Sequence, residues 1–436
     1  MRIAVIVLAL SSFVGAAADA KTVRLTPTSK WFEVLHGSGL KPGDEVILAP
    51  GTYSDRRRLE MNHRGTEGKV IAIRAKGAIL KRPDARQNSI NMAGCQYLEI
   101  HDLEITGGST GIRIERQGKA QPKHLLFEGL HIHHVGGVAI TANHSTSTYE
   151  RLVFRGNHIH HTAGHGEAFY LGGNNTKDGS TTGVMFNSIV ERNYIHHLNG
   201  PKVSQGDGIE IKDGSYGNII RDNVIHDTKY PGVIVYGTDG RKSNVIERNV
   251  IWNTGDNGIQ AAADAIIRNN IIFNTGGNGI YSRDHQSAVV GTLFITHNTV
   301  VTKGRTALRI IPPFNGRKFS GPIVVANNAL YGATAIQAGR GKAIRLVGNA
   351  GSGRISGLGP LAAAQWQGGG AVGADFVKGE RSFYPAPGSC LIGKAAMKNA
   401  VADFNGTKRS QSFDAGAYRF NAKGNPGWKI APGFKK

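Results

Sequence analysis

The stretch Phe127-Glu-Gly-Leu-His-Ile-His-His134 returns 27 residues later as Phe154-Arg-Gly-Asn-His-Ile-His-His161. Six further runs continue this pattern, and each opens with Asn: Asn193-Tyr-Ile-His, Asn223-Val-Ile-His, Asn249-Val-Ile-Trp, Asn270-Ile-Ile-Phe, Asn298-Thr-Val-Val and Asn328-Ala-Leu-Tyr. From Leu103 to Asn328 the successive starting points lie 21 to 36 residues apart. Self-similarity at such a period is typical of stacked repeats. The sequence therefore predicts one long repeat domain.

Each repeat also carries a second short run that a small residue opens. These runs are Gly111-Ile-Arg-Ile, Gly137-Val-Ala-Ile, Ala168-Phe-Tyr-Leu, Gly208-Ile-Glu-Ile, Gly232-Val-Ile-Val, Gly258-Ile-Gln-Ala, Gly279-Ile-Tyr-Ser and Ala307-Leu-Arg-Ile. They alternate with a period of two and are rich in β-branched residues, which indicates short strands. Stacking such strands about 4.8 Å apart pairs their backbone groups with the repeats above and below.

A unit of 21 to 30 residues built from short strands resembles the right-handed parallel β-helix repeat, over residues 95–350. This resemblance implies an all-β fold, a single right-handed parallel β-helix or solenoid with an N-terminal cap and an irregular C-terminal tail. We assign residues 21–94, which include the apolar segment Trp31–Leu35, to the cap and the first coils. Residues 351–436 are expected to form a tail that packs on the helix, because exposed ends of a stack need covering.

Two kinds of column should run along the stack. Inward side chains are expected to form an aliphatic column: Ile159, Ile195, Ile225, Ile251 and Ile272. The repeated Asn is expected at a corner, in the left-handed conformation, with its side chain hydrogen-bonded to the next Asn. The His-rich positions 131–134 and 158–161 invite a zinc interpretation. They continue along the stack as Trp252 and Phe273, however, so we interpret the ladder as packing.

The N-terminal segment predicts export. Arg2 is followed by an apolar run over residues 3–17 and by the small-residue pattern Ala18-Asp19-Ala20, as in a cleavable signal peptide over residues 1–20. A periplasmic or secreted protein is expected, and no later run is apolar enough for a membrane span. For Cys95 and Cys390, a disulfide bridge and two free thiols both remain open.

The amino-acid composition limits the classes of binding partner. The chain has 60 Gly among 436 residues, so turns are frequent, and 40% apolar residues, enough for a large core. Lys and Arg number 52 against 31 Asp and Glu, which gives a net charge of +21. Such a charge favours a polyanion. Outside the cytoplasm we expect an acidic polysaccharide and not nucleic acid, bound by a monomer.

Aligning the second runs places alternate side chains outward in two columns. The first column is Arg113, Ala139, Tyr170, Glu210, Ile234, Gln260, Tyr281 and Arg309. The second is Glu115, Thr141, Gly172, Lys212, Tyr236, Ala262, Arg283 and Ile311. Neighbours in a column lie about 5 Å apart. Four reactive side chains should therefore cluster between the longest inserts, which are typical of groove walls: Tyr170, Glu210, Lys212 and Tyr236.

The segment Gly206-Asp-Gly-Ile-Glu-Ile-Lys212-Asp-Gly-Ser-Tyr-Gly-Asn218 resembles secreted β-helix polysaccharide lyases. The resemblance implies β-elimination on a uronic-acid polymer, in which Arg or Ca²⁺ neutralises the carboxylate, a base removes the C5 proton and an acid protonates O4. We expect Lys212, next to Glu210, to be the base, with a pKa lowered by desolvation or cationic neighbours. Either Tyr236 or Tyr170 would be the acid.

The remaining candidates fall into two groups. Side chains suited to binding the polymer are Arg113, His165, Arg241, Gln260, Tyr281, Arg283 and Arg309. Carboxylates suited to Ca²⁺ are Glu167, Asp207, Asp213 and Asp239. For these carboxylates, ordinary surface charge or turn chemistry remains the alternative.

Three other functions remain open at this stage. A hydrolase would use two carboxylates, Glu210 with Asp213 or Asp239. A C5-epimerase would need the same base without chain cleavage. A non-catalytic protein could hold acidic glycan in a basic groove. The sequence does not distinguish these, nor does it name the sugar.

Overall fold

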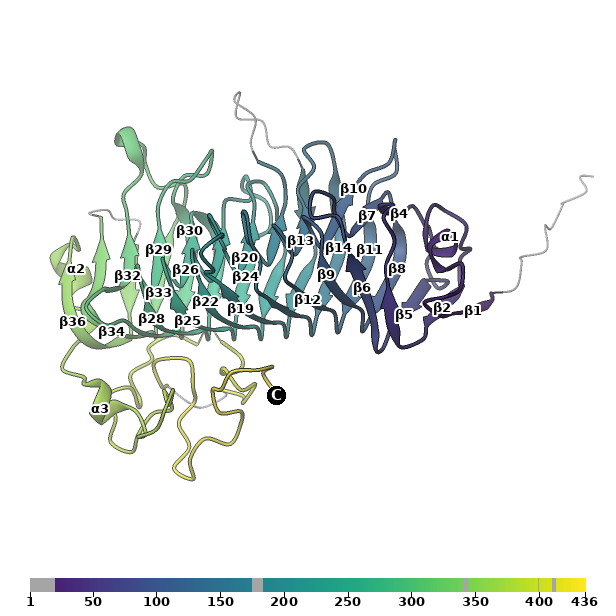
Figure 1. Cartoon of the computed structure of the whole chain (residues 1–436). Coiled ribbons are helices and arrows are strands. Elements are labelled where there is room, and N and C mark those ends of the chain that lie inside the picture. Colours follow the sequence, from purple (N-terminus) through teal and green to yellow (C-terminus); the bar gives the residue numbers. More distant parts are fainter. Residues whose placement is uncertain (1–19, 175–182, 340–343, 399, 410–412) are drawn as a thin grey trace, which may run out of the picture.

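The computed structural model describes residues 20–174, 183–339, 344–398, 400–409 and 413–436. The chain winds into a stack of coils whose short strands line up in three long parallel arrays (Figure 1). We number these arrays sheets 1 to 3, although sheets 2 and 3 are joined near one end into a single hydrogen-bonded sheet. Helical segments are short: α1 (Trp31–Leu35), α2 (Pro360–Ala363), α3 (Val372–Asp375) and the 3₁₀ turn η1 (Phe314–Gly316). The expected signal peptide lies outside the described residues up to position 19. In the described ranges, no helix has the length and apolar character that crossing a bilayer requires.

Sheet 1 runs the whole length of the stack. Its strands are β1 (Thr22–Leu25), β2 (Glu45–Leu48), β5 (Ile71–Arg74), β8 (Gln96–His101), β11 (Lys123–Glu128), β14 (Thr148–Arg155), β18 (Ile189–Glu191), β21 (Ile219–Arg221), β24 (Asn244–Glu247), β27 (Ala263–Arg268), β30 (Gly291–Thr296), β33 (Ile323–Ala326) and β35 (Ile344–Val347), with β17 (Val184–Phe186) beside β14.

Sheet 2 carries the repeated Asn and His runs. Its strands are β3 (Gly51–Tyr53), β6 (Ala78–Arg82), β9 (Glu104–Gly107), β12 (His131–His133), β15 (His158–His160), β19 (Tyr194–Leu198), β22 (Val224–Thr228), β25 (Val250–Thr254), β28 (Ile271–Thr275), β31 (Thr299–Val301), β34 (Ala329–Ala338), β36 (Asn349–Ser356) and β37 (Trp366–Gln367).

Sheet 3 carries the second runs. Its strands are β4 (Leu59–Met61), β7 (Ile90–Ala93), β10 (Ile112–Glu115), β13 (Ile140–Ala142), β16 (Phe169–Leu171), β20 (Ile209–Ile211), β23 (Val233–Val235), β26 (Ile259–Ala261), β29 (Ile280–Ser282) and β32 (Thr306–Ile310). The long strand β34 pairs with both β31 and β32 and so joins sheets 2 and 3. The expected all-β parallel β-helix is confirmed.

The interior follows the predicted column. Ile159, Ile195, Ile225 and Ile251 pair coil to coil in register, and each is fully buried, as is Ile272. Steric crowding explains why a small residue opens each sheet 3 strand. A Cβ on Gly208 would lie 2.3 Å from the carbonyl oxygen of Gly232 in the next coil. A larger residue would therefore force adjacent coils apart at this corner.

The Asn ladder forms as predicted and extends one coil further, to Asn349. Each side chain donates from Nδ2 to Oδ1 of the next Asn at 2.8 to 3.0 Å, along Asn157, Asn193, Asn223, Asn249, Asn270, Asn298, Asn328 and Asn349. The expectation of a left-handed ladder residue is wrong. The residue before it has positive φ, for example Asp222 (57°) and Asn269 (55°). The chain turns one residue earlier, and this leaves the Asn amide buried and aligned with the stack.

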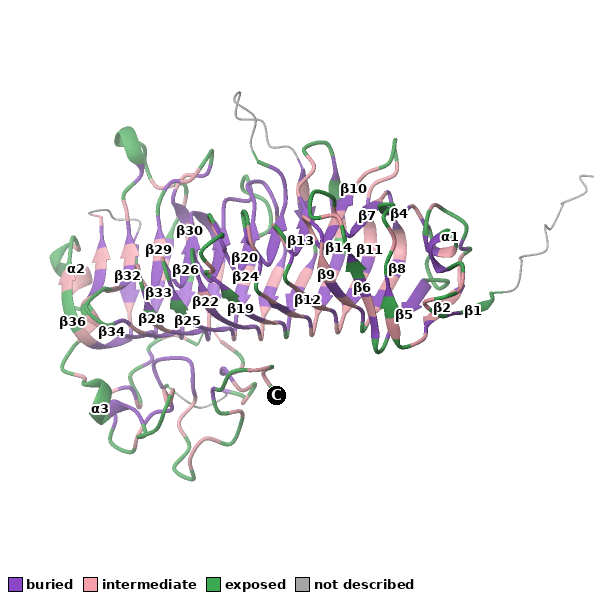
Figure 2. Cartoon of the chain, in the orientation of Figure 1, coloured by how far each residue is buried: buried purple, intermediate pink, exposed green. Residues whose placement is uncertain are grey.

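The two ends of the helix are covered differently. The helix α1 packs beside β4 at the N-terminal end, and Trp31, Phe32 and Leu35 join the main core. Beyond β37 the chain turns back along sheet 2 as a tail of mostly irregular structure (Figure 1). Lys435 anchors its end, because Nζ donates to Oδ1 of Asp222 at 2.8 Å. Figure 2 shows exposed residues concentrated on loops and on the outer parts of this tail.

Cys95 and Cys390 are both free thiols, which answers the question left open by the sequence. Cys95 is buried, and its Sγ donates to the carbonyl oxygen of Met61 at 3.1 Å. Burial raises the pKa of the Cys95 thiol to about 12. Cys390 is half-buried and lies in the tail. The fold therefore depends on the stacked coils and not on a disulfide between these residues.

Candidate active-site groove

The outward column of sheet 3 has the predicted register over most of its length. Strand pairing aligns Tyr170 with Glu210, then Ile234, Gln260, Tyr281 and Arg309 in successive coils. One position is wrong, since Arg113 pairs with Thr141 and not with Ala139. Strand β13 begins at Ile140, later than the run Gly137-Val-Ala-Ile suggests. The offset moves Thr141 from the second column to the first.

The predicted cluster forms on β16, β20 and the segment after β23. Nζ of Lys212 donates to Oε1 of Glu210 at 2.6 Å and to the hydroxyl of Tyr236 at 3.0 Å. The Tyr236 hydroxyl in turn donates to the same Glu210 oxygen at 2.8 Å. The Lys212 ammonium also lies 4.6 Å from the centre of the Tyr170 ring. Parallel stacking thus brings four side chains from three coils into contact, and three of them form one hydrogen-bonded group.

The protonation of Lys212 differs from the expectation. Burial lowers the pKa of Lys212, but the charge of Glu210, followed by smaller contributions from Tyr170 and from hydrogen bonding, outweighs it. On balance the pKa of Lys212 is raised, and the expected lowering is wrong for this arrangement of charges. The side chain is only 6% exposed. Lys212 is therefore an ammonium group held by the Glu210 carboxylate, and it becomes a base only when that charge is balanced otherwise.

The two tyrosines beside Lys212 both remain protonated. Burial, followed by the charge of Glu210, raises the pKa of Tyr236 well above its ordinary value. The same two causes raise the pKa of Tyr170, whose hydroxyl donates to Oδ1 of Asn174 at 3.1 Å. Neutral phenols at these positions can donate protons, which suits the role of an acid.

Glu210 of this cluster is also one of three buried carboxylates that lie side by side. Oxygen atoms of Glu167, Asp207 and Glu210 all lie within 4.8 Å of one another. Neither oxygen of Glu167, nor Oε2 of Glu210, has a hydrogen-bond partner. Burial first, and then the neighbouring carboxylates, raise the pKa of Asp207 and of Glu167. Such a group needs protons or a cation to balance its charge, and carboxylate oxygens are the ligands that Ca²⁺ prefers.

Ten of the residues selected from the sequence line one groove of about 700 Å³. They are His165, Tyr170, Asp207, Glu210, Lys212, Tyr236, Gln260, Tyr281, Arg283 and Arg309. Glu167 is fully buried behind the groove floor. The groove therefore combines the reactive cluster at one end with two arginines and Tyr281 further along the stack.

Four candidates lie outside this groove. Arg113 is two coils before Tyr170 and pairs with Glu115 at 3.0 Å. Arg241 pairs with Asp239 at 3.0 Å and lies over the ring of Tyr216. Asp213 is buried and accepts a hydrogen bond from Ser287. The turns after β20 and β23 carry Asp213, Asp239 and Arg241 away from the groove.

Sequence reasoning missed several lining residues. His285 contacts Tyr236, with ring centres 4.4 Å apart, and burial, then the charge of Arg283, lowers its pKa to about 4. It lies in an insert between β29 and β30, and that insert could have marked it. Asn257 and Asn278 also line the groove. Like Asp207, each precedes the glycine that opens a sheet 3 strand, so this position was a second usable signal.

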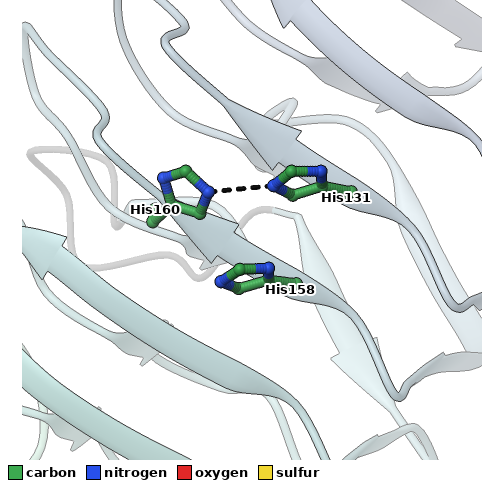
Figure 3. Close-up of side chains that lie close together, drawn as sticks. All are labelled: His131, His158 and His160. Atoms are coloured by element: carbon green, nitrogen blue, oxygen red, sulfur yellow. Dashed lines mark hydrogen bonds between the residues drawn. The ribbon is translucent and has the colours of Figure 1, made fainter. Parts of the chain in front are cut away.

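The histidines of sheet 2 form stacked columns, as the packing interpretation expects. The rings of His133, His160, His196 and His226 stack in succession, 5.0 to 5.2 Å apart. The column continues onto Trp252 at 4.3 Å. Figure 3 shows a feature that one column does not predict: His131 and His158 lie above one another with His160 beside them.

This parallel β-helix belongs to a recognised class. The chain is a member of the right-handed β-helix family, because the family described as right handed beta helix region matches residues 88–245 and 187–329. No curated protein matches the sequence.

Solved structures share the fold at low identity. The structure described as a complex of XylC with xylose is 10% identical with a TM-score of 0.56, covering 87% of this chain and 94% of that chain. The PL6 family alginate lyase AlyGC is 15% identical with a TM-score of 0.54, and the match covers 94% of this chain and 60% of that chain. Pectate lyase Pel9A is 15% identical with a TM-score of 0.50, and the match covers 93% of this chain and 98% of that chain. Identities this low show the fold alone.

Proposed function

We propose that the protein cleaves an anionic, uronic-acid-containing polysaccharide by β-elimination, acting outside the cytoplasm as a monomer. The contact of Lys212 with Glu210 and Tyr236 on the groove floor carries this proposal. An amine, a phenol and a carboxylate within 3.0 Å of one another are the groups that proton transfer at C5 and O4 requires. The net charge of +21 suits a polyanion. The shared fold with an alginate lyase and a pectate lyase adds support by analogy only.

The three buried carboxylates fit a divalent cation such as Ca²⁺. Glu167, Asp207 and Glu210 would hold it, because they converge within 4.8 Å and leave buried oxygens without hydrogen bonds. When bound, the cation would supply positive charge that offsets these carboxylates and attracts the uronate carboxylate. With the charge of Glu210 offset, burial would dominate and favour the neutral amine of Lys212.

In this proposal Lys212 takes the C5 proton and a neighbouring tyrosine donates a proton to O4, whose bond to C4 breaks as the C4–C5 double bond forms. Tyr236 is the better placed acid, because its hydroxyl lies 3.0 Å from the Lys212 amine. A base and an acid this close act on the same face of the sugar. The C5 proton and O4 share a face in mannuronate and glucuronate, and lie on opposite faces in galacturonate and guluronate. The geometry therefore favours the first two.

The rest of the groove would hold the polymer. Arg283 and Arg309 lie in coils beyond the reactive cluster, where guanidinium groups suit further carboxylates along the chain. Tyr281 offers an aromatic face next to Arg309, whose guanidinium lies 5.9 Å from the ring centre. Gln260, in the coil before Tyr281, and His165, just before the strand of Tyr170, add polar contacts in the same groove.

A screen of uronic-acid polymers tests the proposal. Elimination leaves an unsaturated uronate that absorbs ultraviolet light, so absorbance should rise with polymannuronate or glucuronan and rise less with polygalacturonate. Removal of divalent cations with a chelator should abolish the rise, and added Ca²⁺ should restore it. New reducing ends without absorbance would indicate hydrolysis, and C5 inversion without cleavage would indicate epimerisation. Binding of these polymers without any turnover would leave a glycan-binding protein.

One observation favours hydrolysis as a second candidate. The raised pKa values of Asp207 and Glu167 make either carboxyl a proton donor, with Glu210 alongside. Retaining glycosidases place their two carboxyl groups about 5 to 5.5 Å apart, and inverting enzymes place them further apart. The oxygen atoms of these carboxylates lie within 4.8 Å of one another, which is nearer to the retaining spacing than to the inverting one. Glu167→Gln separates the two proposals, because Ca²⁺ would rescue a weakened cation site but not a lost acid.

A further inference from the structure

Sheet 2 presents a dense histidine surface at the N-terminal half of the stack. Three neighbouring columns contribute to it along β9, β12, β15, β19 and the turns after them. Their histidines are His131, His133, His134, His158, His160, His161, His196 and His197. This surface lies on a different sheet from the groove of Lys212, so the two regions are chemically separate.

The composition of the ladder changes where the tail begins to cover it. Trp252 and Phe273 occupy the column under the tail, where Phe383 contacts the ring of Phe273 at 4.7 Å. The C-terminal end reaches the histidines only at its margin, with the ring of Phe434 at 6.2 Å from that of His158. Most covered positions thus carry apolar rings, with the buried His226 at the boundary, and positions beyond the tail carry partly or fully exposed imidazoles. Packing explains the covered part of the ladder but not the choice of histidine beyond it.

Nitrogen atoms converge across the columns at one point. The Nε2 atoms of His131 and His160 lie 2.9 Å apart (Figure 3). His131, His158 and His160 each contribute one ring nitrogen, and these three nitrogen atoms all lie within 4.8 Å of one another. Tetrahedral coordination at the usual zinc–nitrogen length places ligands about 3.4 Å apart, so small side-chain rotations would suffice.

A carboxylate stands behind this group. Oε2 of Glu104 lies 3.6 Å from Nδ1 of His131, on the side of the ring away from His160. A carboxylate in that position favours the tautomer with hydrogen on Nδ1 and leaves the Nε2 lone pair free for a metal. Oε1 of the same carboxylate lies 3.3 Å from Nε2 of His133.

We propose that His131, His158 and His160 bind a first-row transition-metal ion, Zn²⁺, Ni²⁺ or Cu²⁺, with Glu104 as a positioning residue. Imidazole is the ligand that these ions favour, whereas Ca²⁺ and Mg²⁺ favour oxygen. Three protein ligands leave a coordination position open to solvent or to a further ligand. The site is independent of the proposed lyase chemistry, and its failure would leave that proposal intact.

Zinc titration by calorimetry, on protein without a histidine tag and with excess Ca²⁺ to occupy the carboxylate group, tests the site. One equivalent of Zn²⁺ should bind, and the melting temperature of the protein should rise when Zn²⁺ is added. The variants His131→Gln and His160→Gln should each weaken binding about tenfold or more. Glu104→Gln should weaken it less and shift the pH profile of binding to lower pH, because the carboxylate raises the basicity of the His131 ring. His197→Gln is the matched control, because this ladder residue belongs to none of the three-ligand groups found among the described residues.

A Co²⁺ titration adds a readout that folding alone would not change. Coordination by three imidazoles should give a visible absorption spectrum that His131→Gln alters and His197→Gln does not. Equal binding by His131→Gln, His160→Gln and His197→Gln would overturn the proposal, as would the absence of stoichiometric binding to the wild-type protein. Melting without metal shows whether each variant folds, so a misfolded variant is recognised and replaced by His158→Gln.

Discussion

The groove on sheet 3 and the histidine surface on sheet 2 are built by the same coils in opposite ways. On sheet 2 a column repeats one residue type, so His160 stacks on His133 with nearly parallel rings 5.2 Å apart. On sheet 3 the residue type changes at almost every coil, from Tyr170 to Glu210 to Ile234. Repetition yields ladders of like groups, which pack or share a ligand. Variation yields unlike groups in contact, which is what acid–base chemistry needs.

The largest effect on turnover should come from substitutions in the sheet 3 cluster, where unlike side chains are in contact. Lys212→Met should reduce turnover of the responsive polymer about 10³-fold, because a general base contributes on the order of 10² to 10⁴. Tyr236→Phe should reduce it by about 10²-fold if Tyr236 is the acid. Turnover is measured from initial rates of ultraviolet absorbance, with melting curves to show that each variant is folded.

Matched substitutions sharpen this result. Lys303→Met removes an exposed lysine, and Tyr216→Phe removes a phenol that stacks on Phe186 and does not line the groove. Both should keep rates near the wild-type value. Turnover by Lys212→Met within threefold of wild type would show that the ammonium is structural, since it also neutralises the buried Glu210.

The next largest effect should come from breaking a ladder of like groups. Asn270 is fully buried, donates to Oδ1 of Asn298 and accepts from Nδ2 of Asn249. Asn270→Ala removes the side-chain hydrogen bonds to Asn249, Asn298 and the carbonyl oxygen of Ile246, and leaves the buried backbone N–H of Asn249 without its acceptor. This should lower the free energy of unfolding by about 3 kcal/mol. Urea unfolding measures this loss of stability. The exposed Asn421→Ala should change stability by less than about 0.5 kcal/mol, and equal losses in both would contradict a structural role for the ladder.

The same contrast decides what the sequence could predict. The Asn ladder and the column from Tyr170 to Arg309 follow from the repeat, because identical spacing fixes which residues stack. The misplaced residues, Ala139 and Thr141, lie in the one coil where a turn of different length shifts the strand.

Interactions between unlike groups were harder to predict. The pKa of Lys212 depends on the balance between burial and the charge of Glu210, and composition does not supply that balance. His285 reaches the groove from an insert, where no repeat constrains the chain. The cross-column contact of His131 with His160 joins residues that a single ladder keeps apart.

A smaller effect is expected at the far end of the groove. Arg283 is exposed there and lies in a coil beyond the reactive cluster. Arg283→Ala should raise KM about tenfold, about 1.4 kcal/mol, with little change in kcat, because it removes a contact shared by substrate and transition state. Steady-state kinetics on polymers of several lengths measures this. Arg305→Ala, an exposed arginine outside the groove, is the control, and a fall in kcat alone for Arg283→Ala would contradict a binding role.

The smallest effect is a pH dependence of stability that has opposite signs in the two regions. Burial, then the charges of neighbouring histidines, lowers the pKa of His158 to about 4 and of His196 to about 3, from an ordinary value of 6.5. Between about 6.5 and about 4 the unfolded chain therefore binds more protons, and stability falls as the pH is lowered through this window. In the groove, burial raises the pKa of Glu167 and Asp207, so the folded state takes up protons first and gains stability as the pH falls.

Variants of each region should separate these two contributions. The urea midpoint at pH 7 minus the midpoint at pH 5 should be smaller in His158→Gln with His196→Gln than in the wild type. The same signed difference should be larger in Glu167→Gln with Asp207→Asn, measured without divalent cations. The imidazoles are partly exposed, so solvent screening keeps the histidine contribution small. If both double variants changed the midpoint difference in the same direction, the two surfaces would not titrate independently, and the separation between like and unlike columns would fail.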